Sequence, residues 1–99
     1  MSISTTTTDR YSTPGQILKE EFMEPLGITN YRLAHAIGVS ETAVGQIVRG
    51  TRRITPAMAF RLAKAFDTTP AFWANLQTDY DLFTFDPAQL GDIQPLTTA

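Results

Sequence analysis

Polar and basic side chains with hydrogen-bonding capacity are concentrated between Thr29 and Arg53. If this part of the chain is helical, several of its polar positions share one face, since residues one turn apart are neighbours on a helix. These positions are Glu41, Thr42, Gly45 and Gln46. A glutamine amide can pair with adenine through two hydrogen bonds, a carboxylate can accept one from cytosine, and threonine can touch a base or a thymine methyl group. We therefore expect these positions to read base edges in a DNA major groove.

Residues that could hold phosphate stand on both sides of this face. Thr29, Asn30 and Arg32 lie at the expected start of a helix, where free backbone amides and the positive end of the helix dipole attract anions. Further donors for backbone phosphates follow the face: Arg49, Thr51, Arg52 and Arg53. Arginine runs are also common on solvated surfaces, so this run alone is weak evidence. It favours DNA binding because it occurs together with the spacing of small and apolar residues described next.

The spacing of small and apolar residues supplies the elements that would position these groups. Ala34 is small enough for two helices to pass closely, and Gly38 permits a very short turn between them. Val44 and Ile47 of the second helix can then pack into the core against Leu33, Ile37 and Val39. This is the spacing of a helix-turn-helix, whose second helix presents its free face to the major groove.

Helix start and stop signals divide the chain into five predicted helices, at about 14–23, 30–37, 41–49, 56–66 and 70–80. Three begin at Thr-Pro pairs, because threonine caps a free amide and proline suits the first helical position; Thr29 and Ser40 can cap the other two. Gly27, Gly38 and Gly50 stand where three of the helices would end. Leu82 to Phe85 is compatible with a short strand, but no other segment alternates for long enough. The predicted fold class is all-α.

Composition narrows the class of protein further. A chain of 99 residues makes one domain, and no apolar run approaches the roughly 20 residues of a membrane span. The chain has no cysteine and one histidine, His35, so it cannot build a thiolate or zinc site, and no glycine-rich turn supports a catalytic serine. The polar start, Met1 to Thr13, lacks the apolar stretch of a secretory signal. We expect a cytoplasmic protein without metal or cofactor that is not an enzyme, with His35 at the surface or in helix packing.

Charge is strongly separated along the chain, although the net value of −2 at first argues against a nucleic-acid partner. From Ile28 to Lys64 six basic residues stand against Glu41 alone, and from Ala65 to Ala99 there are five aspartates and no basic residue. Phosphates respond to the field within about a Debye length, ~8–10 Å, and not to the total charge. An acidic protein can therefore carry a basic DNA-binding face.

Residues 14–82 resemble the Cro and phage-repressor (XRE) class, and more narrowly the HigA-type antitoxins, also called virulence-associated protein I. The resemblance covers about two thirds of the chain. Its marks are Pro14-Gly15-Gln16-Ile17-Leu18, Gly27-Ile28-Thr29, Arg49-Gly50-Thr51-Arg52-Arg53-Ile54-Thr55, and Thr69-Pro70-Ala71-Phe72-Trp73-Ala74-Asn75-Leu76-Gln77 with Tyr80-Asp81-Leu82. The last mark is the most specific, because it reaches beyond what a generic helix-turn-helix needs.

The resemblance implies a five-helix bundle of the phage-repressor (lambda repressor-like) type and a protein with two kinds of partner. Such antitoxins silence a basic RelE-like endoribonuclease that cuts mRNA on the ribosome, here a HigB-type toxin. They also repress their own operon by binding a palindromic double-stranded DNA operator as homodimers. The alternative is a stand-alone XRE-family repressor without a toxin, and the neighbouring gene would separate the two.

Two surface assignments remain open between a functional and a structural role. The apolar residues of the last helix and just after it would form either a dimer interface or plain core: Phe72, Trp73, Leu76, Tyr80 and Phe83. The acidic residues Glu20, Glu21 and Glu24 are more simply a solvated face than a toxin contact. The expected organisation is a flexible Thr-rich arm at 1–13, a helix-turn-helix domain at 14–82 with a dimerising last helix, and a tail at 83–99.

Overall fold

The first predicted helix is a continuous helical run whose hydrogen-bonding pattern changes along its length. In the computed structural model, which describes residues 12–97, it begins as α2 (Pro14–Ile17), continues as the π-helix η1 (Leu18–Met23) and ends as α3 (Glu24–Leu26). Thr13 and Gln16 form a reciprocal capping box at its start. Because Pro25 has no backbone N–H, the α-helical ladder cannot continue unchanged past it. Gly27 ends the run in the left-handed conformation with φ at 65°, so its last residue is Leu26, three residues later than predicted.

The central pair of helices has the bounds that the sequence predicts. These are α4 (Asn30–Ile37) and α5 (Glu41–Arg49). The hydroxyl of Thr29 accepts from the Arg32 amide at 3.1 Å, and that of Ser40 accepts from the Ala43 amide at 3.0 Å, so both predicted caps are confirmed. Gly38 ends α4 with φ at 73°, a left-handed conformation that glycine adopts without steric cost. The turn between the two helices is correspondingly short, as the helix-turn-helix requires.

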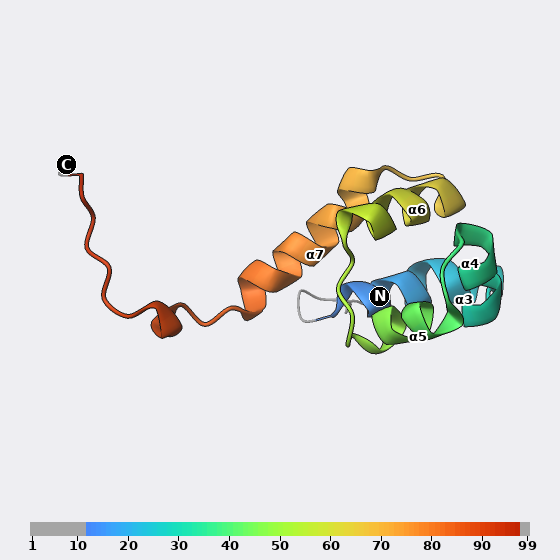
Figure 1. Cartoon of the computed structure of the whole chain (residues 1–99), viewed down its shortest axis with the longest axis horizontal. Coiled ribbons are helices and arrows are strands. Elements are labelled where there is room, and N and C mark those ends of the chain that lie inside the picture. The colour runs from blue at the N-terminus through green and yellow to red at the C-terminus, as the bar shows by residue number, and fades with distance from the viewer. Residues whose placement is uncertain (1–11, 98–99) are drawn as a thin grey trace, which may run out of the picture.

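The last two helices pack against each other and lead into an extended C-terminal segment (Figure 1). They are α6 (Pro56–Phe66) and α7 (Pro70–Thr84), capped by Thr55 and Thr69. The expectation of a short strand at Leu82 to Phe85 is wrong, because Leu82 to Thr84 form the last turn of α7. There the Thr84 hydroxyl donates to the Tyr80 carbonyl at 2.8 Å, and no strand occurs among the described residues to pair with this segment. A short 3-10 helix, η2 (Pro87–Leu90), follows.

A single core lies between the helices and is centred on Trp73. This side chain has no exposed surface, and its indole N–H donates to the Thr68 hydroxyl at 2.7 Å. The ring of Phe22 packs on it with centroids 4.8 Å apart, which ties the first helical run to α7. The largest other fully buried side chains come from every remaining helix of the body: Leu18, Leu33, Val44, Ile47 and Leu62. The predicted all-α fold class is confirmed.

Gly15 sets how closely the first helix approaches the end of α5. A Cβ atom on Gly15 would lie 1.7 Å from the carbonyl oxygen of Ile47, so no larger residue fits without moving backbone. This contact explains why a glycine follows the helix-starting proline, and it fixes the position of α5 from behind. Among residues 12–97 no helix is both long and apolar enough to cross a membrane.

The predicted division of the chain can be followed only in part. The arm at 1–13 falls almost wholly outside the described residues, which begin at Ser12. The predicted boundary between residues 82 and 83 lies inside α7, whose last residue is Thr84. Beyond it the described part of the tail extends away from the helical body (Figure 1).

Candidate nucleic-acid interface

The helix α5 has one face in the core and the opposite face towards solvent. Ala43, Val44 and Ile47 are buried, whereas Glu41 and Thr42 are exposed and Gln46 is half-buried. The predicted reading residues Glu41, Thr42 and Gln46 are therefore brought together on the accessible side of a helix that is held rigidly from behind. Figure 1 shows α5 at one edge of the body, next to α4. A helix in the position of α5 can enter a major groove with these three side chains directed at the base edges.

Gly45 lies on the same side but has little surface of its own, because two longer side chains cover it. A Cβ atom at this position would lie 3.2 Å from Nη1 of Arg49 and 3.8 Å from Nδ2 of Asn30. The absence of a side chain thus leaves room above α5 for Arg49 and Asn30, which come from different helices. Gly45 itself is buried, and its place in the base-reading set stays a prediction.

The loop after α5 folds back on Gln46. The Thr51 hydroxyl donates to the Gln46 carbonyl at 3.2 Å, and Nε of Arg52 donates to Oε1 of Gln46 at 2.9 Å. From the sequence, Gln46 belongs to the base-reading set and Arg52 to the phosphate set. In the structure, the side chains of Gln46 and Arg52 form one hydrogen-bonded pair. The sequence does not show this pairing, because the two residues are six positions apart and the helix ends between them.

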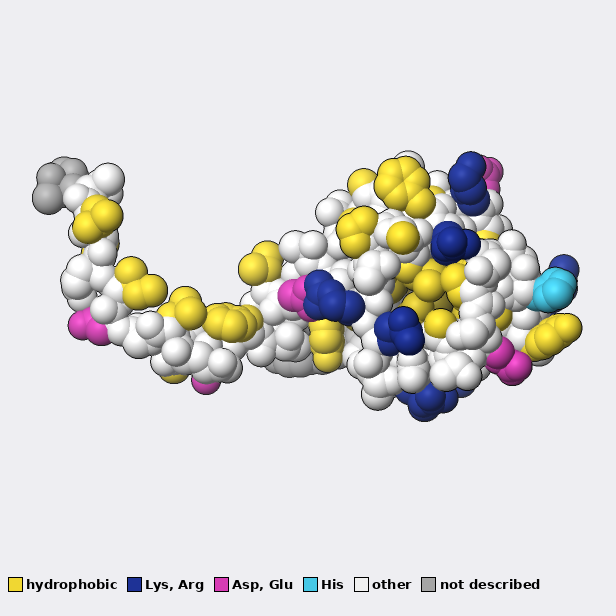
Figure 2. Space-filling view, in the orientation of Figure 1, with side chains coloured by type: hydrophobic (Ala, Val, Ile, Leu, Met, Phe, Trp, Pro, Cys, Tyr) yellow, Lys and Arg dark blue, Asp and Glu magenta, His cyan; other side chains and the backbone are white. Residues whose placement is uncertain are grey.

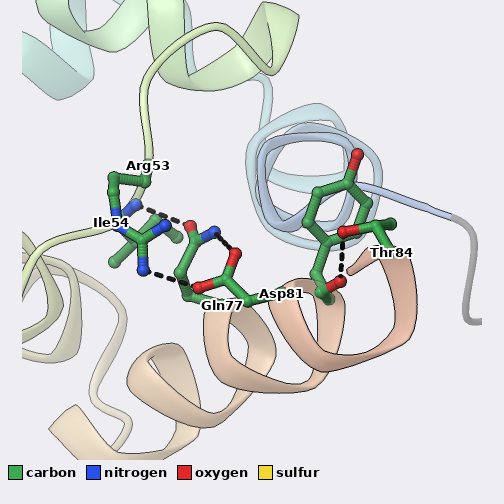
Figure 3. A network of polar contacts seen from close by, with 6 residues as sticks. Arg53, Ile54, Gln77, Asp81 and Thr84 are labelled. Atoms are coloured by element: carbon green, nitrogen blue, oxygen red, sulfur yellow. Dashed lines mark hydrogen bonds and ion pairs between the residues drawn. The ribbon is translucent and has the colours of Figure 1, made fainter. Parts of the chain in front are cut away.

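Arg53 points in another direction and is held by α7 (Figure 3). Its Nη2 lies 2.6 Å from Oδ2 of Asp81 in an ion pair between partly exposed side chains. Gln77 donates to the other carboxylate oxygen at 3.0 Å and accepts from the backbone amide of Ile54 at 2.7 Å. The hydrogen bond from Arg53 lowers the pKa of the Asp81 carboxyl, with Gln77 adding to the effect and burial opposing it. The predicted phosphate role of Arg53 would thus require this ion pair to open.

Asp81 and Gln77 are functional neighbours that the sequence reasoning missed. Gln77 is the one buried polar side chain among the described residues, and it joins the loop backbone at Ile54 to α7. Both residues occur in the stretch that marks the family resemblance, and the sequence analysis gave neither of them a part in holding the loop. Their i, i+4 spacing was the available signal, since it places an amide and a carboxylate on one face of a helix.

At the start of α4 the predicted phosphate ligands divide into two groups. The Thr29 hydroxyl accepts from the Arg32 amide as the helix cap, and its own O–H can still donate to a phosphate. Arg32 is exposed and, with Arg61 and Lys64, lines a cavity of about 400 Å³ between α4 and α6. Arg61 also donates to the carbonyl of Ile37 and so caps the end of α4. Figure 2 shows Lys and Arg side chains on the helical body and only acidic charge on the extended segment.

The predicted dimer residues differ in exposure. Trp73 is inside the core of the single chain and has no surface for a partner, so its place in a dimer interface is corrected to core. Leu76 and Tyr80 are half-buried, while Phe72 and Phe83 are 37% and 38% exposed. The exposed apolar surface continues beyond them to Leu82 and Phe85. A dimer contact through this end of α7 remains a prediction.

The remaining candidates lie at the surface. Glu20, Glu21 and Glu24 are exposed on the first helical run, and their contact with a toxin remains a prediction. His35 is exposed and stacks on Tyr31, with ring centroids 5.8 Å apart. Within the described ranges no three His, Cys, Asp or Glu side chains are grouped as metal ligands would be.

The comparisons with known proteins agree with this geometry. The helix-turn-helix family matches residues 19–73. The chain is 49% identical over 72 residues to an uncharacterised HTH-type transcriptional regulator of Haemophilus influenzae, a match that covers 73% of this chain and 67% of the relative. It is 40% identical over 87 residues to virulence-associated protein I of Dichelobacter nodosus, covering 86% of this chain and 81% of the relative.

A solved structure extends the similarity to three dimensions. It is described as Pseudomonas aeruginosa antitoxin HigA with the higBA promoter, is 42% identical to this chain and superposes with a TM-score of 0.81. The match covers 88% of this chain and 99% of the solved one. With its helix-turn-helix at α4 and α5 and this similarity along the rest of the body, the chain belongs to the XRE-type helix-turn-helix family and, within it, to the HigA-type antitoxins also known as virulence-associated protein I.

Proposed function

We propose that this protein binds the operator of its own operon and silences a toxin encoded beside it. The observation that carries the first half is the solvent-facing side of α5, with Glu41 and Thr42 exposed and Gln46 beside them. The solved relative with its promoter supports the same role for this face, since the two chains share both sequence and fold. An operator lies on the bacterial chromosome or a plasmid, so the proposal places the protein in the cytoplasm.

Base reading and phosphate binding are assigned to different parts of this face. Glu41, Thr42 and Gln46 would enter the major groove, whereas Arg49 and Asn30 would contact phosphates beside it. Arg52 and Thr51 stand at the end of α5, where the groove wall would pass. The separation of charge along the chain favours this orientation, because the aspartates after Lys64 are repelled by phosphate.

A homodimer is part of the proposal. One short recognition helix reaches only a few base pairs, so useful specificity requires two copies on one DNA face, about 34 Å apart. The exposed apolar end of α7, at Leu82 and Phe83, is the surface assigned to pairing. A symmetric pair through this surface would match a palindromic operator.

The toxin partner is proposed to be a basic, RelE-like mRNA endonuclease of the HigB type. The chain has five aspartates and no basic residue after Lys64, and three exposed glutamates on its first helical run, Glu20, Glu21 and Glu24. Either surface complements a basic protein electrostatically. A stand-alone repressor with the same DNA-binding face is the second candidate.

Two measurements test the proposal. Mobility-shift assays with the promoter upstream of the gene, against an unrelated duplex of equal length, test operator binding. Co-purification with the product of a short, basic neighbouring reading frame, followed by an mRNA-cleavage assay with and without this protein, tests the antitoxin role. If the protein binds the promoter but no toxin co-purifies with it, the stand-alone repressor is the remaining candidate. If neither promoter binding nor a toxin complex is observed, the proposal is wrong.

A further inference from the structure

The side-chain amide of Gln46 has its acceptor oxygen occupied within the molecule. Oε1 accepts from Nε of Arg52 at 2.9 Å, and the backbone carbonyl of Gln46 accepts from the amide of Thr51 at 2.9 Å and from its hydroxyl at 3.2 Å. These bonds attach the loop to Gln46, and the Gly50 amide donates to the Ile47 carbonyl at 3.0 Å where Gly50 turns the chain with φ at 85°. These bonds hold Arg52 beside Gln46 and set which way the amide faces.

Arg52 keeps most of its donors for another partner. Among residues 12–97 it takes part in no ion pair, whereas the neighbouring Arg53 is paired with Asp81. Its Nε is used by Gln46, so the two terminal nitrogens, which a guanidinium always keeps protonated, stay available. The side chain is exposed, so these donors can meet a ligand outside the molecule.

The base that the side-chain amide of Gln46 can pair with depends on whether this amide is already hydrogen-bonded within the protein. A free amide offers one acceptor and one donor, which matches the N6 donor and N7 acceptor of adenine. Arg52 uses one of the two lone pairs of Oε1 and places its own donors beside this oxygen, so the pair presents mainly donors to a base: Nε2 of Gln46 and the terminal nitrogens of Arg52. Guanine presents two acceptors, N7 and O6, in the major groove, so a paired set of donors fits guanine and meets the N6–H of adenine with a mismatched donor.

We infer that Gln46 and Arg52 form one reading unit that selects guanine, in which Arg52 contributes donors to the base and also sets the preference of Gln46. The inference deepens the proposed operator binding and rests on it. It revises the expectation that Gln46 alone pairs with adenine, and it moves Arg52 from the phosphate-binding set to the base-reading set.

The experiment is a selection of binding sites from a random duplex library by the full chain and its variants. The wild type, Gln46→Ala, Arg52→Ala and the control Lys19→Ala, an exposed basic residue of the first helical run, are compared at equal salt. The base pair whose preference disappears with Gln46→Ala identifies the position that Gln46 reads. There the wild type and Lys19→Ala should select guanine, whereas Arg52→Ala should select adenine because it frees Oε1. In binding assays each preferred base should be favoured by about 5- to 150-fold, the range of one bidentate contact.

The outcomes separate the inference from the proposed function. If the wild type selects adenine at that position, or Arg52→Ala still selects guanine with a uniformly weaker affinity, the reading unit is overturned. If the wild type selects no sequence at all, the operator-binding proposal fails as well. Melting curves recorded by circular dichroism establish that Arg52→Ala is folded, which its exposed position predicts.

Discussion

Arg53 and Asp81 stand 28 positions apart in the sequence, and their side chains form an ion pair with Nη2 and Oδ2 at 2.6 Å. The pair joins the loop after the recognition helix to the penultimate turn of α7 (Figure 3). Through Gln77, the same carboxylate is linked to the buried amide of Ile54. The position of the DNA-facing loop therefore depends on the helix that carries the proposed dimer surface.

The Arg53–Asp81 pair predicts a weak acid dependence of stability. Because the hydrogen bond from Arg53 lowers the pKa of Asp81 in the folded state, its contribution is fully present above the unfolded value of about 3.9. It is lost as the pH falls through the lower folded value. Asp81→Asn should therefore show a smaller fall in Tm than the wild type between pH 5 and pH 2, expressed relative to each protein at pH 7. The difference should be small because both side chains are partly exposed, and an unchanged pH dependence would show that the pair contributes nothing.

Gly15→Ala should destabilise the fold severely. The new Cβ would lie 1.7 Å from the Ile47 carbonyl oxygen, which is backbone and cannot rotate away. We expect a loss of ~3 kcal/mol or more, from overpacking at a rigid contact, and a Tm fall of roughly 12–24 °C. The matched control is Gly27→Ala, where no atom lies within 4 Å and only the left-handed φ of 65° costs about 1–2 kcal/mol. Equal effects in thermal melts would mean that the helix contact is easily displaced.

Gln77→Leu should leave the amide of Ile54 without its acceptor. A buried unsatisfied N–H costs about 1–3 kcal/mol, so chemical unfolding should show a loss of this size. Asn75→Leu, an exposed position on the same helix, serves as the control and should change stability by less than about 0.5 kcal/mol. A stability of Gln77→Leu equal to that of the control would contradict the proposed bracing of the loop.

Arg49 and Arg53 should differ in their contribution to non-specific DNA affinity. Arg49 is exposed over Gly45 on the DNA-facing side, so Arg49→Ala should reduce the slope of log affinity against log salt by about 0.9, the value for one phosphate. Arg53→Ala should change the slope much less, because its side chain is held by Asp81. Titrations of a fluorescent duplex at several salt concentrations measure both, and equal slopes for the two variants would show that the ion pair opens on DNA.

Leu82→Glu should weaken dimerisation without unfolding the chain. Leu82 is 73% exposed at the end of α7, so a charge there disturbs a partner and not the core. Sedimentation at micromolar concentration should show a shift towards monomer, with a steeper loss of operator than of random-duplex affinity. Trp73→Ala is a different case and should cost about 3–5 kcal/mol in folding, since the ring is fully buried. A wild-type monomer on a palindromic operator would refute the dimer.

Local signals in the sequence were sufficient for most helix bounds. Thr29 and Ser40 cap α4 and α5 as predicted, and Gly38 and Gly50 end them with positive φ. Such signals involve residues within a few positions of each other, so one sequence contains all the information needed. α6 (Pro56–Phe66) also has its predicted bounds, whereas the first helical run and α7 continue past their predicted ends, to Leu26 and Thr84. Asp67 ends α6 at a φ of 55°, a left-handed conformation in which glycine is the more usual residue.

The residue types and spacing by themselves thus determined the helix-turn-helix and the face of α5 that carries Glu41, Thr42 and Gln46. Periodicity settles which side of a helix is polar, because burial follows the 3.6-residue repeat. Partner choice among surface side chains was decided only by the tertiary structure. Arg52 and Arg53 are adjacent and chemically identical, yet one binds Gln46 and the other Asp81. The reason is physical: the side chains of neighbouring loop residues point in different directions, and only the packed helices place one acceptor in each direction.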